Sequence, residues 1–133
     1  PITDLQAAKL SVVDYVTKLE SVMIRTAADF GIEAERNPMN RGVWVGRNKL
    51  GSIGIALRRW ITFHGFAFNV NLSLEPFSWI NPCGLQGVGV TSLEQELSEK
   101  ISVKQVWERV RGHIETVFEL RLEIIPFENI PFA

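Results

Sequence analysis

Two side chains of this sequence, a cysteine and a lysine, could together carry out nucleophilic chemistry. Cys83 lies in the stretch Asn81-Pro82-Cys83-Gly84, where the proline fixes φ and the glycine permits backbone angles that other residues avoid. The stretch therefore predicts a tight turn that holds the thiol in place. A thiol attacks as its thiolate, and the thiolate needs a base or a positive charge nearby.

Lys49 is the candidate proton partner of this thiol. It opens an expected strand, directly after the turn Gly46-Arg47-Asn48. A lysine drawn into a site of low polarity can exchange protons with a thiol. Each residue also has an ordinary interpretation, because most lone cysteines are small buried hydrophobic groups and most lysines are solvated.

The two histidines are weaker candidates. His64 lies in Thr62-Phe63-His64-Gly65 and offers the other usual way to activate a thiol, but we slightly favour a core or edge histidine with satisfied hydrogen bonds. His113 has polar neighbours in an expected helix, and we expect it at the surface. With one cysteine and two histidines in the chain, we expect neither a zinc site nor an internal disulfide.

The middle of the chain is rich in glycine and poor in charge. Eight of the ten glycines lie between residues 42 and 89, and Glu75 is the only formally charged residue between Trp60 and Leu93. Turns and bulges explain any single glycine, but so many in strand-like segments indicate a close approach of the backbone to another group. Phe63, Phe66, Phe68 and Phe77 lie in the same region.

Hydrophobic periodicity divides the rest of the chain into helices and strands. Helical spacing predicts two helices, and alternation predicts four strands that form a mixed or antiparallel sheet flanked by those helices, which is an α+β fold. Capping-box patterns begin both helices, at Ser11 with Asp14 and at Ser102 with Gln105, and Gly31 stands where the first helix should end. The expected helices cover residues 11–30 and 103–119, and the expected strands cover residues 42–45, 50–57, 66–72 and 121–125.

Composition excludes several classes of function. The net charge is −1 with both signs interspersed, and 46% of the residues are apolar, so we expect a globular domain without a nucleic-acid interface. No apolar run is long enough to span a bilayer. A single cysteine is compatible with a reducing compartment.

Around these candidate residues the sequence resembles the octanoyl-acyl carrier protein:protein N-octanoyltransferases, also called the lipoate-protein ligase B family. Three motifs of the family occur here in the family's order. A lysine at the start of a strand segment matches Lys49, and a histidine-glycine segment matches His64 to Val70. A proline-cysteine-glycine turn matches Cys83. The resemblance extends over essentially the whole chain. The stretches that carry it are GVWVGRNKLGSIGIALRRWITFHGFAFNVN (42–71) and PFSWINPCGLQGVGVTSL (76–93).

The resemblance implies a cytoplasmic acyltransferase of lipoate biosynthesis with the catalytic fold of biotin and lipoate protein ligases. Such enzymes move an octanoyl group from the thioester of acyl carrier protein to a lysine of a lipoyl domain, in 2-oxoacid dehydrogenases or in the glycine cleavage H protein. By residue match, Cys83 carries the acyl group and Lys49 takes the thiol proton. No cofactor or metal is implied, because the thioester is already activated. The implied substrate-binding residues are Ser52, Ile53, Gly54, His64, Gly65, Phe66 and Ala67.

Members of the family are longer than this sequence. Their earlier segment, an arginine-glycine-glycine run followed by a threonine-histidine-glycine-proline-glycine-glutamine stretch, has no counterpart here. We therefore interpret residues 1–133 as a single domain that is the C-terminal part of an octanoyltransferase catalytic domain. Because a sheet without the missing strands would expose apolar edges, we expect the chain to pair with a complementary N-terminal segment or with another copy.

Two other functions remain open. An ATP-dependent lipoate or biotin ligase of the same broad fold would keep the lysine without needing the cysteine, but no nucleotide-binding loop is visible. A non-catalytic module that binds an acyl chain or a lipoyl domain would need neither residue as a catalyst. Capture of an octanoyl group on Cys83 distinguishes the acyltransferase from both.

Overall fold

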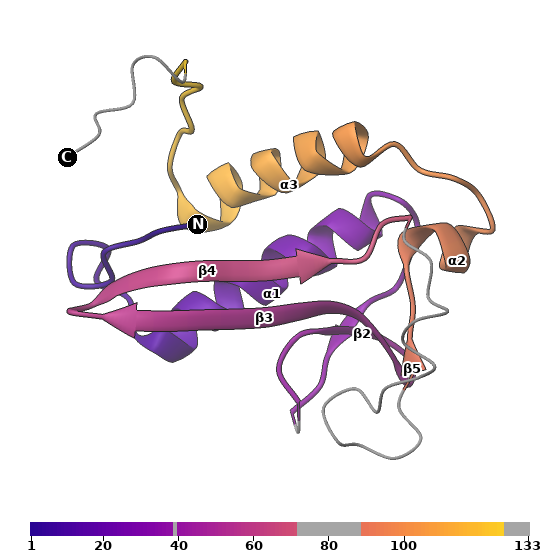
Figure 1. Cartoon of the computed structure of the whole chain (residues 1–133), viewed down its shortest axis with the longest axis horizontal. Coiled ribbons are helices and arrows are strands. Elements are labelled where there is room, and N and C mark those ends of the chain that lie inside the picture. The colour runs from indigo at the N-terminus through magenta and orange to yellow at the C-terminus, as the bar shows by residue number, and fades with distance from the viewer. Residues whose placement is uncertain (39, 72–88, 127–133) are drawn as a thin grey trace.

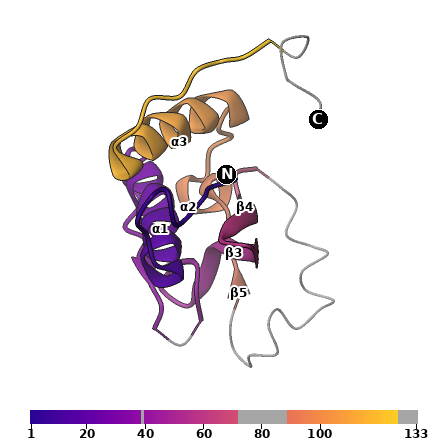
Figure 2. The same ribbon diagram turned by 90° about the vertical axis from the view of Figure 1, so that its left-hand side faces the viewer.

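A mixed β-sheet with two long helices on one of its faces forms the body of the computed structural model (Figure 1). The structure describes residues 1–38, 40–71 and 89–126. Helix α1 covers Val12–Ala28 and helix α3 covers Val103–Phe118. Viewed from the side, α1 lies beside the strands and α3 lies above α1 (Figure 2). The expected α+β class, with a mixed sheet flanked by helices, is confirmed.

Helix α1 begins as its capping box predicts. The hydroxyl of Ser11 accepts from the N–H of Asp14 at 3.0 Å, and the Asp14 carboxylate accepts from the N–H of Ser11 at 3.3 Å. These bonds to Ser11, with a smaller contribution from Lys18, lower the pKa of the Asp14 carboxyl, so the cap is fully charged at neutral pH. The helix ends at Ala28, and Gly31 follows with the left-handed φ of +78° that favours glycine.

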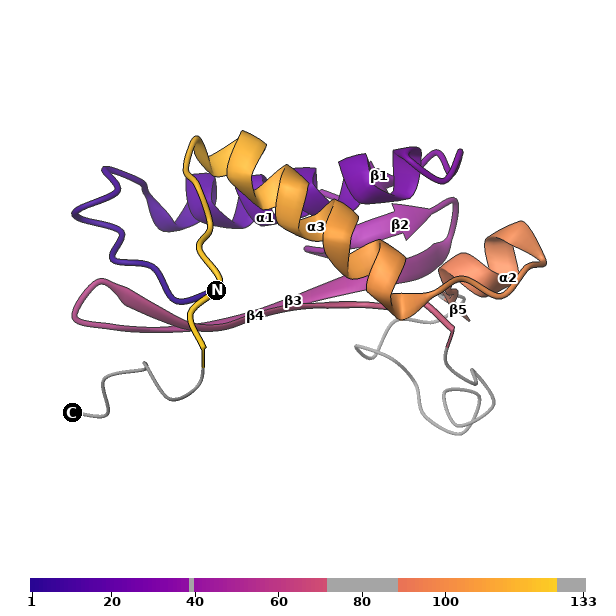
Figure 3. The same ribbon diagram turned by 90° about the horizontal axis from the view of Figure 1, so that it is seen from above.

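The sheet has the order β1-β2-β3-β4, and every neighbouring pair in that series is antiparallel. The short strand β5 adds to β3 in parallel, so the sheet is mixed. Seen from above, α3 crosses α1, and its N-terminal end extends toward β3 and β4 (Figure 3). The strands are β1 (Glu35–Arg36), β2 (Val43–Val45), β3 (Asn48–Arg58), β4 (Ile61–Phe68) and β5 (Gly89–Val90).

A two-residue turn joins β3 to β4, and its position corrects the predicted strand boundaries. Arg58 pairs with Ile61, and the turn residues Arg59 and Trp60 have φ values of +50° and +66°. Two successive positive φ angles are the signature of a type I′ hairpin turn, which usually uses asparagine and glycine. The sequence lacked that signal, so the strand expected at residues 66–72 in fact covers 61–68.

The hairpin ends at Phe68 because the next residues bond elsewhere. The carbonyl of Asn69 accepts from the N–H of Leu93, and that of Val70 accepts from the N–H of Glu94. These bonds hold the chain against the start of the short helix α2 (Leu93–Leu97) instead of extending the strand.

The hydrophobic core fills the space between the helices and the sheet. Residues of α1, β2, β3 and α3 form its larger part, and a second cluster lies at the other end of α1. Tyr15 belongs to that second cluster, where its ring meets the ring of Phe118 edge-on at 5.8 Å and its hydroxyl donates to the carbonyl of Pro1 at 3.0 Å. The main buried residues of the two clusters are Met23, Ala27, Ile32, Val43, Leu50, Leu93 and Val106, and Leu5, Tyr15 and Leu19.

The C-terminal part of the described chain differs from two predictions. Ser102 precedes α3, but its side chain makes no capping hydrogen bond, so the predicted capping box with Gln105 is wrong. Residues 121–125 do not form the predicted strand. They lie against α3 instead, because the N–H of Leu122 donates to the Glu115 carboxylate at 2.8 Å and the carbonyl of Leu122 accepts from Arg111 at 2.9 Å.

Within residues 1–38, 40–71 and 89–126, no helix has the length and apolar character that crossing a membrane requires.

Candidate functional site

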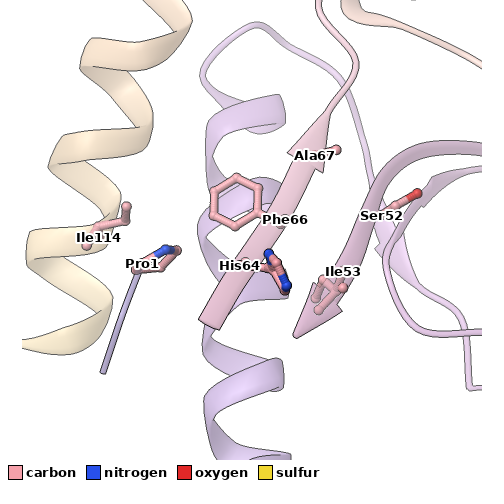
Figure 4. A pocket seen from close by; sticks show the side chains of 9 residues that line it. Pro1, Ser52, Ile53, His64, Phe66, Ala67 and Ile114 are labelled. Atoms are coloured by element: carbon pink, nitrogen blue, oxygen red, sulfur yellow. The ribbon is translucent and has the colours of Figure 1, made fainter. Parts of the chain in front are cut away.

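All seven predicted substrate-binding residues line one cavity of about 730 Å³ beside the β3–β4 hairpin. Pro1 and Ile114 of α3 complete its lining, and Figure 4 shows both on the opposite side of β4 from Ile53 and Ser52. The residues from the hairpin are Ser52, Ile53, Gly54, His64, Gly65, Phe66 and Ala67.

The strand register explains why two separate sequence segments meet at this cavity. Ser52 pairs with Ala67, Ile53 with Phe66, and Gly54 with Gly65. Directly opposed residues of an antiparallel pair are close neighbours, so the two segments form one continuous wall. The wall is mostly apolar, and its glycines and alanine leave the space that larger side chains would fill.

Gly65 is required by a close approach of the N-terminal residues. A Cβ atom at this position would lie 2.7 Å from Cδ of Pro1, closer than carbon atoms pack. The terminal residues are held there by hydrogen bonds, since the N–H of Thr62 donates to the carbonyl of Thr3 at 2.9 Å and the N–H of Leu5 donates to the carbonyl of Trp60 at 2.9 Å. A side chain at residue 65 would therefore displace part of the cavity wall.

His64 has an unusual backbone conformation. Its φ is +65° in the middle of a strand, opposite Ile55, a region that non-glycine residues seldom occupy and that often marks functional sites. Its imidazole projects toward Ile53 (Figure 4), and the residue lines the cavity.

Lys49 does not line the cavity but lies on the same strand, three residues before Ser52. It is 7% exposed. Its Nζ donates to Oδ1 of Asn40 at 2.5 Å and lies 5.2 Å from the centre of the Trp44 ring. Lys49 is thus largely withdrawn from solvent, and specific groups hold its amine.

Glu20 on α1 anchors the loop that carries Asn40. Its side chain is fully buried, and it accepts from the N–H of Gly42 at 3.1 Å and from the guanidinium groups of Arg41 and Arg36 at 3.3 Å. Sequence reasoning missed both Glu20 and Asn40. A signal for Glu20 was present, because this acidic residue interrupts the apolar stripe of α1.

Cys83 lies outside the described residues, but residues on both sides of segment 72–88 are fixed next to Lys49. The N–H of Asn69 donates to the carbonyl of Leu50 at 3.0 Å, and the N–H of Thr91 donates to the carbonyl of Lys49 at 3.0 Å. In β5, Val90 pairs directly with Lys49. Asn69 and Val90, one before and one after the segment that contains Cys83, therefore both lie beside Lys49.

His113 is partly exposed on α3, where it makes a specific contact. Its side chain is 22% exposed, and its Nε2 lies 2.8 Å from the carboxylate of Asp29, which Arg109 also approaches at 4.0 Å. His113 therefore joins α3 to the end of α1. In the described parts of the chain, no three histidine, cysteine, aspartate or glutamate residues are grouped so that they could hold a metal ion.

Comparison with known proteins agrees with this geometry. Residues 1–115 match the family described as the lipoyl protein ligase A/B catalytic domain. Over 120 residues the chain is 52% identical to an octanoyltransferase of Desulfotalea psychrophila, an alignment that covers 89% of this chain and 54% of that protein. The chain spans about half the length of the curated relatives it matches.

Two solved structures share the fold. Biotin protein ligase from Aquifex aeolicus superposes with a TM-score of 0.68 at 15% identity, covering 89% of this chain and 50% of that one. A lipoate-protein ligase A bound with ATP superposes with a TM-score of 0.71 at 11% identity, covering 86% and 49%. The match to residues 1–115 and this shared fold lead to one conclusion: the chain belongs to the lipoyl protein ligase A/B catalytic domain family.

Proposed function

We propose that this chain provides the acyl-binding and catalytic part of an octanoyltransferase of lipoate biosynthesis. The observation that carries the proposal is the cavity itself, because the seven residues expected to bind the acyl group come together around it, on the strand that also bears Lys49. The relative at 52% identity is named an octanoyltransferase, which supports octanoyl as the transferred group.

The cavity has the size and lining that a medium-length acyl chain needs. Its volume is about 730 Å³, and Ile53, Phe66 and Ala67 supply apolar surface. Each methylene transferred from water to such a surface contributes roughly 0.8 kcal/mol. Of the other phenylalanines expected to form the site, Phe63 and Phe68 do not line the cavity, and Phe77 lies outside the described residues.

The proposed reaction has two acyl transfers. Lys49 takes the proton of the Cys83 thiol, and the thiolate attacks the carbonyl carbon of octanoyl-acyl carrier protein. The carrier's sulfur leaves with a proton as the new thioester on Cys83 forms. The ε-amine of a lipoyl-domain lysine then attacks this thioester, so that an amide bond forms, the Cys83 sulfur leaves, and the amine's proton returns to it through Lys49.

The described ends of segment 72–88 support a meeting of the two catalytic residues. Cys83 is six positions before Gly89 in the sequence, and Gly89 pairs with Asn48, next to Lys49. A fully extended chain of that length reaches at most about 22 Å. Contact between Cys83 and Lys49 is within that reach, which supports the proposal.

The proposal extends to partners and location. Its substrates are octanoyl-acyl carrier protein and the lipoyl domains of 2-oxoacid dehydrogenases and of the glycine cleavage H protein, and its compartment is the cytoplasm. The reaction as written uses no cofactor. An ATP-dependent ligase and a non-catalytic acyl-binding module are the outcomes that would replace it.

The first expected result is an octanoyl group on Cys83. Incubating the chain with octanoyl-acyl carrier protein should add the mass of one octanoyl group to the peptide that contains Cys83, and Cys83→Ser should not acquire it. Intact-protein and peptide mass spectrometry measure both. Octanoyl binding without an adduct would indicate a binding module, and ligation of free lipoate that requires ATP would indicate a ligase.

The second expected result concerns association. The hairpin exposes large apolar side chains at Leu57, Trp60, Ile61 and Phe63, whose exposed fractions range from 38% to 48%, and such a cluster usually marks a contact surface. We therefore expect the chain to pair with a complementary N-terminal segment or with a second copy. Sedimentation that finds only a monomer at high concentration, unchanged when that segment is added, contradicts this expectation.

A further inference from the structure

The side chain of Asn40 is placed so that it can control the position of Lys49. It lies in the loop between β1 and β2, and its Oδ1 accepts from Nζ of Lys49 at 2.5 Å. We propose that Asn40 is a positioning residue for Lys49, which holds the amine in one direction for proton exchange. The catalytic meaning of this inference rests on the proposed function, whereas the contact itself does not.

Asn40 is itself held at both of its backbone groups. Its N–H donates to Oδ1 of Asn37 at 3.2 Å, and its carbonyl accepts from Nε1 of Trp44 at 3.1 Å. Trp44 is 2% exposed and sits in the sheet next to Lys49, with which it pairs. The amide of Asn40 therefore extends from a fixed point, so its oxygen can fix the amine.

Gly42 brings the same loop against the stem of the lysine. Its φ is +127°, and a Cβ atom there would lie 2.4 Å from the carbonyl oxygen of Gly51 and 2.8 Å from Cε of Lys49. Its N–H donates to the buried carboxylate of Glu20 at 3.1 Å. The loop can lie against Lys49 because residue 42 has no side chain, and the Glu20 carboxylate fixes the backbone of the loop there.

These contacts confine an otherwise flexible side chain. A lysine has a four-carbon stem and samples many rotamers when exposed. Here the amine lies between the amide oxygen of Asn40 and the face of the Trp44 ring. Confinement of a proton donor and acceptor in a reactive orientation is a major source of rate enhancement.

The choice of an amide also has a chemical reason. The oxygen of Asn40 can accept a hydrogen bond from a lysine amine in either protonation state, so it can hold the amine before and after proton exchange. A carboxylate at the same place would favour the charged ammonium, because an opposite charge within a few ångströms stabilises it. An amide positions the amine and leaves it able to exchange its proton.

A labelling experiment tests the contact without using activity. Acetic anhydride modifies only unprotonated amines, so the extent of Lys49 acetylation against pH, read by peptide mass spectrometry, reports its protonation and accessibility. Asn40→Asp should move the midpoint of this curve upward by about one pH unit. Asn40→Leu, which removes the acceptor, should raise the rate of acetylation because the amine is released.

The matched control is Gln105→Glu, which makes the same amide-to-carboxylate change at an exposed position on α3. It should leave the Lys49 curve where it is in the parent. Near-ultraviolet circular dichroism and the thermal midpoint confirm that each variant is folded. An Asn40→Asp curve that coincides with that of the control, or unchanged acetylation in Asn40→Leu, overturns the inference.

A kinetic experiment tests the catalytic part. Asn40→Leu should lower kcat for octanoyl transfer by about 10- to 100-fold with little change in KM, because the acyl cavity is untouched. Asn40→Asp should regain activity at alkaline pH, with a shift equal to that of its labelling curve. If the parent forms no acyl-cysteine, the proposed function fails while the labelling result still decides whether Asn40 positions Lys49. If the parent is active and Asn40→Leu keeps its kcat, the inference is wrong.

Discussion

Replacing Lys49 with methionine should lower the rate of octanoyl transfer by about 10²- to 10⁴-fold, the usual contribution of a positioned acid–base group. Methionine keeps the length and much of the apolar contact of the lysine stem, which is 7% exposed, but it cannot take the proton of a thiol. Single-turnover acylation of Cys83 by octanoyl-acyl carrier protein measures the effect, because it isolates the first chemical step.

Lys104→Met is the matched control for this variant. Lys104 is exposed on α3, so the same change in charge should leave the rate of acylation as it is in the parent. The thermal midpoint of Lys49→Met must be measured beside the rate, since the lysine also contacts the Asn40 loop. Acylation within threefold of the parent rate, in a folded variant, would remove Lys49 from the mechanism.

Replacing Glu20 with alanine should destabilise the fold by about 2–4 kcal/mol. The carboxylate is fully buried and accepts from the N–H of Gly42 as well as from Arg36 and Arg41. The two arginines are 44% and 53% exposed and can return to water, but the buried N–H of Gly42 would lose its acceptor, which costs about 1–3 kcal/mol. The space left in the core adds a further penalty.

Two other variants show which contact of Glu20 accounts for the loss of stability. Glu20→Gln keeps an oxygen that can accept from Gly42 while removing the charge, so its loss should be about half as large. Glu33→Ala, at an exposed position beyond the end of α1, should stay within about 0.5 kcal/mol of the parent. Urea unfolding curves measure all three, and equal stability of Glu20→Ala and Glu33→Ala would contradict the anchoring role.

The effect of Glu20 on the position of the loop can be measured apart from its effect on the free energy of unfolding. Because Glu20 holds the loop that carries Asn40, Glu20→Gln should also increase acetylation of Lys49, though less than Asn40→Leu does. Such an increase would show that Glu20 on α1 acts on the amine of Lys49 on β3 through the loop between β1 and β2. Two contacts make this connection, from Glu20 to Gly42 and from Asn40 to Lys49.

Much of the fold could be predicted because its signals are local. The capping box at Ser11 and the apolar stripe that follows place α1 within a residue or two of its observed bounds, and the stripe of α3 does the same. The hairpin turn at Arg59 and Trp60 was missed because its two left-handed residues carry no turn chemistry of their own. The twist of the paired strands, rather than the residue types, imposes that turn.

The predicted strand at 121–125 shows how tertiary contacts override a local pattern. Its alternating apolar residues resemble a strand, but Glu115 and Arg111 on α3 bind the backbone of Leu122. A strand forms only where a sheet edge is available to pair with it, and this segment lies against a helix. Position in the fold, which the sequence does not state, decided its conformation.

The candidate site also contains residues that the sequence could predict and residues that it could not. The cavity residues Ser52 to Gly54 and Gly65 to Ala67 could be named from their resemblance to family motifs, and the strand register then placed them together. Asn40 could not be named, because its contact with Lys49 depends on the path of an irregular loop and on the buried carboxylate of Glu20. Such contacts leave no periodic trace in a sequence.

The seating of Pro1 has a practical consequence for anyone who prepares this protein. Pro1 lines the cavity, and its carbonyl is bonded to the hydroxyl of Tyr15, so any polypeptide joined to its nitrogen starts at the cavity wall. An affinity tag or a cleavage scar fused there would compete with ligands for space and could imitate inhibition. Binding studies should therefore compare chains that differ only in the residues joined to Pro1.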